Sequence, residues 1–229
     1  MDFKKMLKKL EEDRQFRNME LRAVANEGEN KEFRVEGYAC MFEQPFVLGS
    51  FRDWDGVQYE IREQVARDAF AGCDMSDVIF NLNHEGRVYA RLSNNTLKLA
   101  TDDKGLHVDA YLGGTEEGRK IHEEIQGGYL TKMSYQFKVK EDKREEFTEG
   151  EKRVILRTIT KYEKLYDVSV VSIPADDHTS ISARGYCDGV IADLEAERLK
   201  VQESEKQKRQ AIAEAEARER DLQLLKLGK

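Results

Sequence analysis

The chain has 229 residues, which is enough for one sizeable domain with extensions. Charged residues make up 36% of it, against about 25% in an average soluble domain, so part of the chain builds no hydrophobic core. The net charge of -7, spread without a basic face, argues against nucleic acid as the main partner, and the apolar runs are far shorter than the roughly 20 residues that span a bilayer.

The first third of the chain begins with a charged segment and then changes to strand-forming residues. Residues 1–20 carry apolar side chains along one stripe and predict a charged helix. The run FRVEGYACMF (33–42) is β-branched and aromatic and predicts a strand. Residues 63–72 (EQVARDAFAG) have an apolar helical face and predict a short helix. The run VIFNLNH then predicts a buried strand that ends at His84.

The clearest local signals lie between residues 97 and 140. Two alternating runs flank Asp102-Asp103-Lys104-Gly105, which predicts a hairpin. Thr115 is suited to cap a helix that ends at a double glycine, 127–128. The run YLTKMSYQFKVK predicts a strand in which Tyr135 faces one side and Ser134 the other, because successive side chains alternate.

The last third of the chain predicts further strands followed by a tail. A polar excursion at 141–153 separates the preceding strand from one or two strands in 154–174. The charged residues 188–229 hold no heptad pattern and predict a solvated helix or a disordered tail. The expected fold is therefore mostly β with flanking helices (α+β): a charged helix at 1–20, a β-rich domain at 21–187 and the tail.

Cysteine usage and the N-terminus indicate the cellular compartment. Cys40, Cys73 and Cys187 are widely spaced and odd in number, which favours a reducing compartment such as the cytosol over a disulfide framework. The first residues lack the apolar region of a signal peptide. Because no pair of Cys or His residues has zinc-ligand spacing, no metal and no other cofactor is expected.

Three residues are candidates for chemistry. His84, at a strand end beside a glycine turn, is held by a rigid element yet reaches the surface, which suits a general base. Ser134 lies on a strand just after the double glycine, and Asp167 lies in an otherwise apolar strand. Each has a plainer interpretation, as a loop histidine, a surface serine and a carboxylate on a wet face, and residue chemistry alone does not choose between them.

Three segments in order bring a known family into view. NLNHEGRVYAR, then GGYLTKMSYQF, then LYDVSVVSIPA resemble the prohead maturation proteases of tailed bacteriophages, which are related in fold to the herpesvirus assemblin proteases. The resemblance covers roughly residues 33–185. It implies an assemblin-like antiparallel β-barrel with helical extensions at both ends. This chain departs from the family in the segment KMSYQF: Gln136 stands directly before the aromatic Phe137, where members commonly have glycine.

The resemblance also implies roles for individual residues. The family's general base falls on His84 and its nucleophilic serine on Ser134. The third position falls on Asp167, with Asp176, Asp177 or His178 as alternatives. In this scheme His84 takes the proton of Ser134, and Asp167 holds the histidine in the correct tautomer.

A loop that resembles the assemblin oxyanion loop follows the third segment. The resemblance implies that backbone amides near Ala175 and Asp176 stabilise the oxyanion of the tetrahedral intermediate.

The resemblance implies a serine endopeptidase of capsid maturation. Its expected substrates are scaffold segments and the removable part of the major capsid protein, inside the assembling prohead in the host cytoplasm. Self-processing of the terminal extensions is also expected, and a homodimer is left open; neither nucleic acid nor a membrane is an expected partner. One rival hypothesis is a non-enzymatic scaffolding or assembly protein built on the same β domain, and a second is a generic β-barrel binding module of a bacterial cell in which Ser134 and His84 are unrelated.

Overall fold

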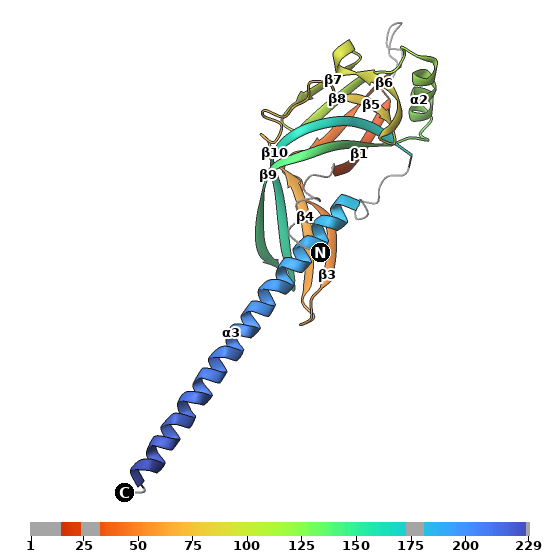
Figure 1. Cartoon of the computed structure of the whole chain (residues 1–229). Coiled ribbons are helices and arrows are strands. Elements are labelled where there is room, and N and C mark those ends of the chain that lie inside the picture. Colours follow the sequence, from red (N-terminus) through yellow and green to blue (C-terminus); the bar gives the residue numbers. More distant parts are fainter. Residues whose placement is uncertain (1–14, 24–32, 173–180, 228–229) are drawn as a thin grey trace. The chain divides into compact units, whose positions relative to one another are not determined.

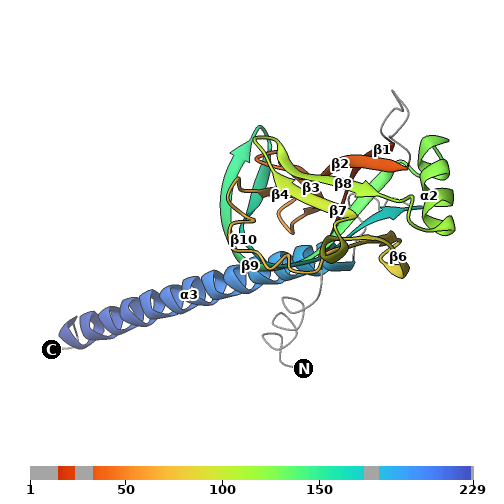
Figure 2. The same ribbon diagram turned by 90° about the horizontal axis from the view of Figure 1, so that it is seen from above.

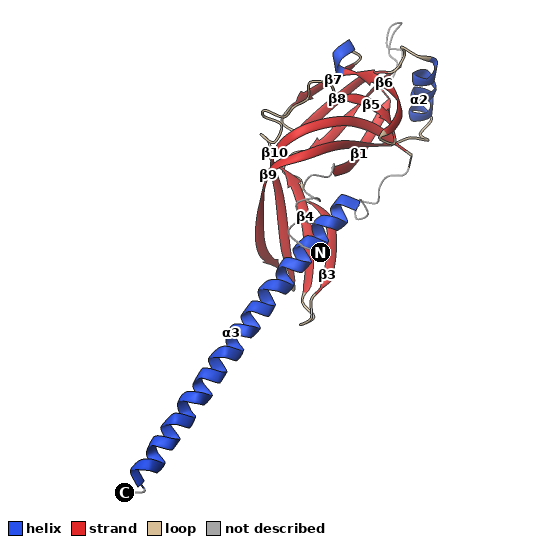
Figure 3. Ribbon diagram, in the orientation of Figure 1, coloured by secondary structure: helices blue, strands red, loops and turns tan. Residues whose placement is uncertain are grey.

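The computed structural model describes residues 15–23, 33–172 and 181–227. It consists mostly of strands with two α-helices (Figure 3), so the predicted mostly β fold with flanking helices is confirmed. The chain divides into two compact units between Cys187 and Asp188. The elements in chain order are β1 (Gln15–Ala23), β2 (Arg34–Met41), β3 (Phe46–Arg52), β4 (Gln58–Val65), β5 (Ile79–Leu82), β6 (Glu85–Arg91), a 3-10 turn (Leu92–Asn94), β7 (Leu97–Thr101), β8 (Gly105–Tyr111), α2 (Glu116–Gln126), β9 (Lys132–Glu149), β10 (Lys152–Val171) and α3 (Ile181–Leu227).

The strands form one continuous path around the two longest strands, β9 and β10 (Figure 1). The order is β3-β4-β10-β9-β1-β2-β8-β7, and β5 pairs with the second half of β10 and with β6. Most pairs are antiparallel, but β10 runs parallel to both β4 and β5. Strand β1 continues the path from β9 to β2. Among the described residues no ladder joins β6 to β7, so the path resembles a barrel without a hydrogen-bonded closure there.

Alternation along β9 and β10 separates an apolar face from a polar face, because neighbouring side chains in a strand point to opposite sides. Tyr135 and Phe137 of β9, with Val168 and Val170 of β10, belong to the main hydrophobic core. The opposite face of the same stretches carries polar side chains, and these are also buried, namely Ser134, Gln136, Asp167 and Ser169. Burial of four polar residues together marks this face as the place to look for a functional site.

The local predictions between residues 97 and 127 are confirmed. The hairpin of β7 and β8 turns through Asp102, whose Oδ1 accepts hydrogen bonds from the backbone N–H groups of Lys104 (2.7 Å) and Gly105 (3.0 Å). Thr115 caps α2, since its Oγ1 accepts from the backbone N–H of Gly118 at 3.0 Å. Helix α2 lies at one end of the strands beside β6 (Figures 1 and 2), where Arg87 and Glu117 form an ion pair.

Three predicted elements differ in the structure. Residues 15–20 lie in a strand and not in a helix, because they form an antiparallel ladder with β9, and residues 21–23 continue the same strand beside β2; residues 1–14 of that predicted helix lie outside the described residues. Strand β4 runs to Val65, and residues 66–72 form successive turns and no helix. Residues 141–153 are not a separating excursion, since β9 and β10 continue through them as one long hairpin.

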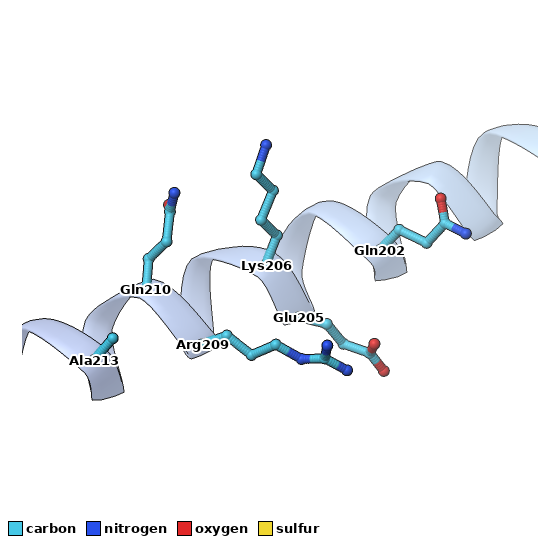
Figure 4. Close-up of a pocket in the computed structure, with 6 residues that line it drawn as sticks. All are labelled: Gln202, Glu205, Lys206, Arg209, Gln210 and Ala213. Atoms are coloured by element: carbon cyan, nitrogen blue, oxygen red, sulfur yellow. The ribbon is translucent and has the colours of Figure 1, made fainter.

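The second unit, Asp188–Lys229, consists of the helical residues up to Leu227. A shallow concavity on it is lined by side chains of α3 alone (Figure 4), five of them polar. All six lining side chains are exposed, so the concavity is a feature of a solvated helix surface and not an enclosed site. None of the described helices is apolar over a stretch that would cross a membrane.

Candidate active site

The turn between β5 and β6 presents His84. Leu82 pairs with Glu85, so Asn83 and His84 form a two-residue hairpin loop, and both have positive φ angles, 56° and 60°. Such a loop usually has glycine at its second position, because a side chain there is strained. A histidine held in this conformation costs about 1–3 kcal/mol and persists only where its surroundings enforce it, which points to a functional role.

Hydrogen bonds to the end of β10 hold this turn in place. The backbone N–H of Asn83 donates to the carbonyl of Val170 at 2.9 Å. The Asn83 side chain donates to Ser172 Oγ at 3.0 Å and accepts from the backbone N–H of Ser172 at 2.9 Å. Three hydrogen bonds, one to Val170 in β10 and two to Ser172 just after its end, therefore fix the position from which His84 projects.

The imidazole of His84 meets the carboxylate of Asp167. His84 Nδ1 lies 2.6 Å from Asp167 Oδ1, although the two residues are 83 positions apart. Both side chains are largely buried, with exposures of 14% and 5%. Because a carboxylate only accepts hydrogen bonds, the Nδ1 atom carries the proton in this pair, which leaves Nε2 as the basic nitrogen.

A second polar side chain contacts the same imidazole nitrogen. Ser169 Oγ lies 3.1 Å from His84 Nδ1 and donates to Asp167 Oδ1 at 2.6 Å. It also forms a short hydrogen bond with the side chain of Asn81. We did not identify Ser169 or Asn81 as site residues from the sequence. The signal for Ser169 was its i, i+2 spacing from Asp167, which puts both on one face of a strand; Asn81 joins them only through the pairing of β5 with β10.

Ser134 lies in the same row of the sheet. In the β9–β10 ladder Ser134 pairs directly with Ser169, and in the β10–β5 ladder Ser169 pairs with Asn81. Residues that pair in register share a face, with Cβ atoms about 4.5–5.5 Å apart in an antiparallel pair. Ser134 is therefore one strand away from a side chain that contacts His84. Its side chain is 2% exposed, although the sequence suggested a solvent-facing serine as the plainer interpretation.

The remaining candidates lie outside the described residues. Ala175 and Asp176, proposed for the oxyanion, lie outside the described residues, as do the alternatives Asp177 and His178. In the described part of the chain no three His, Cys, Asp or Glu side chains are grouped as metal ligands.

A comparison with protein families gives one match. The sequence profile of the family described as caudovirus prohead serine protease matches residues 17–188, which is more than half of the chain. The same chain has no match among the curated proteins and none among the solved structures.

Proposed function

The chain belongs to the caudovirus prohead serine protease family, and from that premise we propose that it is a serine endopeptidase with Ser134 as nucleophile, His84 as general base and Asp167 as the orienting acid. The observation that carries this assignment is the 2.6 Å contact between His84 Nδ1 and Asp167 Oδ1, made by a histidine on a strained turn. An imidazole whose Nδ1–H is bound to a carboxylate has its Nε2 ready to accept a proton.

The proposed mechanism follows the movement of one proton. His84 Nε2 takes the proton from Ser134 Oγ as that oxygen attacks the scissile carbonyl carbon. The imidazolium then gives the proton to the leaving amine, and the C–N bond breaks to leave an acyl group on Ser134. Water attacks the ester with the same histidine as base, which releases the new carboxylate and restores the serine. Asp167 stabilises the imidazolium that forms in each half of the reaction.

Two features of the site suit this chemistry, the hydrogen bonds to Asp167 and the strands on either side of Ser134. Asp167 is held by two donors on one oxygen, the imidazole of His84 and the hydroxyl of Ser169, so it acts without reorganising when charge develops on the ring. Ser134 sits on a strand bordered by two others, β1 and β10, so its backbone is rigid. A nucleophile on a rigid element keeps the near-attack geometry on which rate depends.

Family membership implies a role in capsid maturation, with capsid proteins as substrates, inside the assembling phage capsid in the host cell. We propose further that the bonds cleaved lie in scaffold segments and in the removable part of the major capsid protein. Self-processing of the terminal extensions belongs to the same proposal. Backbone amides at Ala175 and Asp176 remain our proposal for the oxyanion site.

The decisive experiment combines a covalent probe with co-expression of the capsid protein. Wild-type protein is expected to react with a fluorophosphonate and to process the co-expressed capsid protein, and Ser134→Ala is expected to lose both activities. Ser76→Ala is a matched control, since Ser76 also donates to an aspartate, Asp74, at 2.7 Å but on the exposed surface. If freshly purified wild-type protein neither reacts with the probe nor processes the capsid protein, the scaffolding hypothesis is favoured and the protease assignment is wrong.

A further inference from the structure

We propose that Ser169 and Asn81 are positioning residues for this reaction: together they hold the proton of His84 on Nδ1 and keep Asp167 aimed at it. The proposal rests on the proposed function, because it concerns the same histidine. It assigns no contact with the substrate to either residue. In this proposal the catalytic arrangement depends on a row of side chains across three neighbouring strands, β9, β10 and β5, and not on the three catalytic residues alone.

The contacts of Ser169 require a specific arrangement of protons. Its single hydroxyl lies within hydrogen-bonding distance of three groups, Asp167 Oδ1 (2.6 Å), His84 Nδ1 (3.1 Å) and the amide of Asn81. A serine hydroxyl has one proton to donate and two lone pairs to accept with. Since the carboxylate can only accept, the proton of Ser169 goes to Asp167. Ser169 must then accept from the other two groups.

This arrangement determines the tautomer of His84. If Ser169 accepts from the imidazole, Nδ1 carries a proton, which is shared between Ser169 Oγ and Asp167 Oδ1. The opposite tautomer would place the Nδ1 lone pair against a carboxylate oxygen 2.6 Å away, which is repulsive. Ser169 therefore acts with Asp167 to keep Nε2 as the basic nitrogen.

Asn81 completes the arrangement. An asparagine amide can turn so that its nitrogen takes the place of its oxygen. In the structure Asn81 Oδ1 faces Ser169 Oγ and accepts from it; with the amide turned so that its nitrogen faces Ser169, Asn81 donates to the remaining lone pair of the hydroxyl, which leaves the serine proton free for Asp167. The opposite orientation would ask one hydroxyl to donate twice. Asn81 is 4% exposed and Ser169 is fully buried, so water does not compete for these bonds.

The same geometry argues against Ser169 as the nucleophile. Its hydroxyl contacts Nδ1, the nitrogen that also faces Asp167, whereas a nucleophile needs the nitrogen that the acid leaves free. Ser134 lies one strand further along the row, in register with Ser169.

The test measures the rate of fluorophosphonate labelling of the full-length chain in Ser169→Ala, Ser169→Cys and Asn81→Ala. Loss of a hydrogen bond to a charged group predicts labelling about 10- to 100-fold slower for both Ser169 variants and about 3- to 10-fold slower for Asn81→Ala. Ser169→Cys separates loss of volume from loss of hydrogen bonding, because a thiol is slightly larger than the hydroxyl and leaves no cavity but is a weak donor. Ser76→Ala, which removes an exposed Ser–Asp bond, is the matched control and is expected to label at the wild-type rate.

A spectroscopic readout distinguishes positioning from a loss of packing. Wild-type protein is expected to show the downfield proton resonance of a hydrogen-bonded imidazole N–H, and the Ser169 variants are expected to shift or lose it while the thermal midpoint stays above the assay temperature. Wild-type labelling rates in Ser169→Cys, with Ser134→Ala unreactive, would overturn this inference and leave the proposed function standing. Labelling that persists in Ser134→Ala but disappears in Ser169→Ala would overturn both, since Ser169 would then be the nucleophile.

Discussion

Replacing Glu63 by Gln is expected to destabilise the β domain strongly without touching the His84 cluster. Glu63 lies on β4 and is fully buried. It accepts hydrogen bonds from Arg17 Nε (2.6 Å) and Nη2 (2.7 Å), and from Arg157 Nη1 (3.0 Å). One carboxylate thus pairs with two guanidinium groups, one from β1 and one from β10. It ties the N-terminal strand to the centre of the sheet.

The magnitude follows from the burial of all three groups. The side chains of Arg17 and Arg157 are only 7% and 6% exposed. A glutamine keeps the shape but removes the negative charge that both arginines share, so Arg17 loses this carboxylate and Arg157 keeps only its ion pair with Asp142 among the two carboxylates it contacts. Breaking a buried ion pair in this way costs about 3–5 kcal/mol. For a domain of this size each kcal/mol lowers the thermal midpoint by about 2–4 °C, which gives a decrease of about 6–20 °C.

The same carboxylate predicts how stability depends on pH. Burial by itself raises the pKa of Glu63, but Arg17 and Arg157 outweigh it and hold that pKa below its ordinary value. The unfolded chain therefore binds the proton more readily than the folded one. The stabilisation is fully present above the ordinary glutamate pKa of about 4.3, and it is lost as the pH falls through the lowered value. Glu63→Gln should lack this acid-dependent loss.

Thermal and urea unfolding of Glu63→Gln, at neutral pH and down an acid series, measure both effects. Glu149→Gln is the matched control, because Glu149 also pairs with an arginine, Arg62, but its side chain is half exposed. Exposed pairs contribute little, so its midpoint should be close to that of the wild type. A Glu63→Gln protein destabilised by less than about 1 kcal/mol would refute the reasoning, since the buried arginines would then not depend on this charge.

Three further predictions concern the site and helix α2. Asp167→Asn should slow fluorophosphonate labelling by about 10³–10⁴-fold with the fold intact, because the amide favours the wrong tautomer of His84; a loss below tenfold would transfer the acid's role to another residue. Asn83→Gly keeps the positive φ but loses both side-chain bonds to Ser172, each contributing about 1 kcal/mol, so labelling should slow by about tenfold; an unchanged rate would show that the turn needs no clamp. His122 on α2 is 2% exposed, and burial lowers its pKa, so stability should fall as the pH drops below the ordinary histidine pKa of about 6.5. The thermal midpoints at pH 8 and pH 5 should therefore differ less in His122→Leu than in the wild type. An equal difference would exclude this histidine as the cause.

Features encoded by a few neighbouring residues could be predicted from the sequence. The Thr115 cap and the Asp102 turn are local hydrogen-bonding patterns, so the side chain and its backbone partner lie within four residues of each other. The alternation of β9 likewise predicted Tyr135 on the core side. Residues 15–20 could not be assigned in this way, because their structure is decided by the ladder with β9, whose residues are more than a hundred positions away in the sequence.

The sequence by itself determined the class of fold, the ends of several elements and, through the resemblance to phage prohead proteases, the three residues proposed for catalysis. Only the tertiary structure brought Asn81 and Ser169 beside them and buried Glu63 between two arginines. The reason is register. Two side chains from distant strands meet only when the parallel ladder of β5 on β10 and the antiparallel ladder of β9 on β10 align the same row, and no local pattern encodes that alignment.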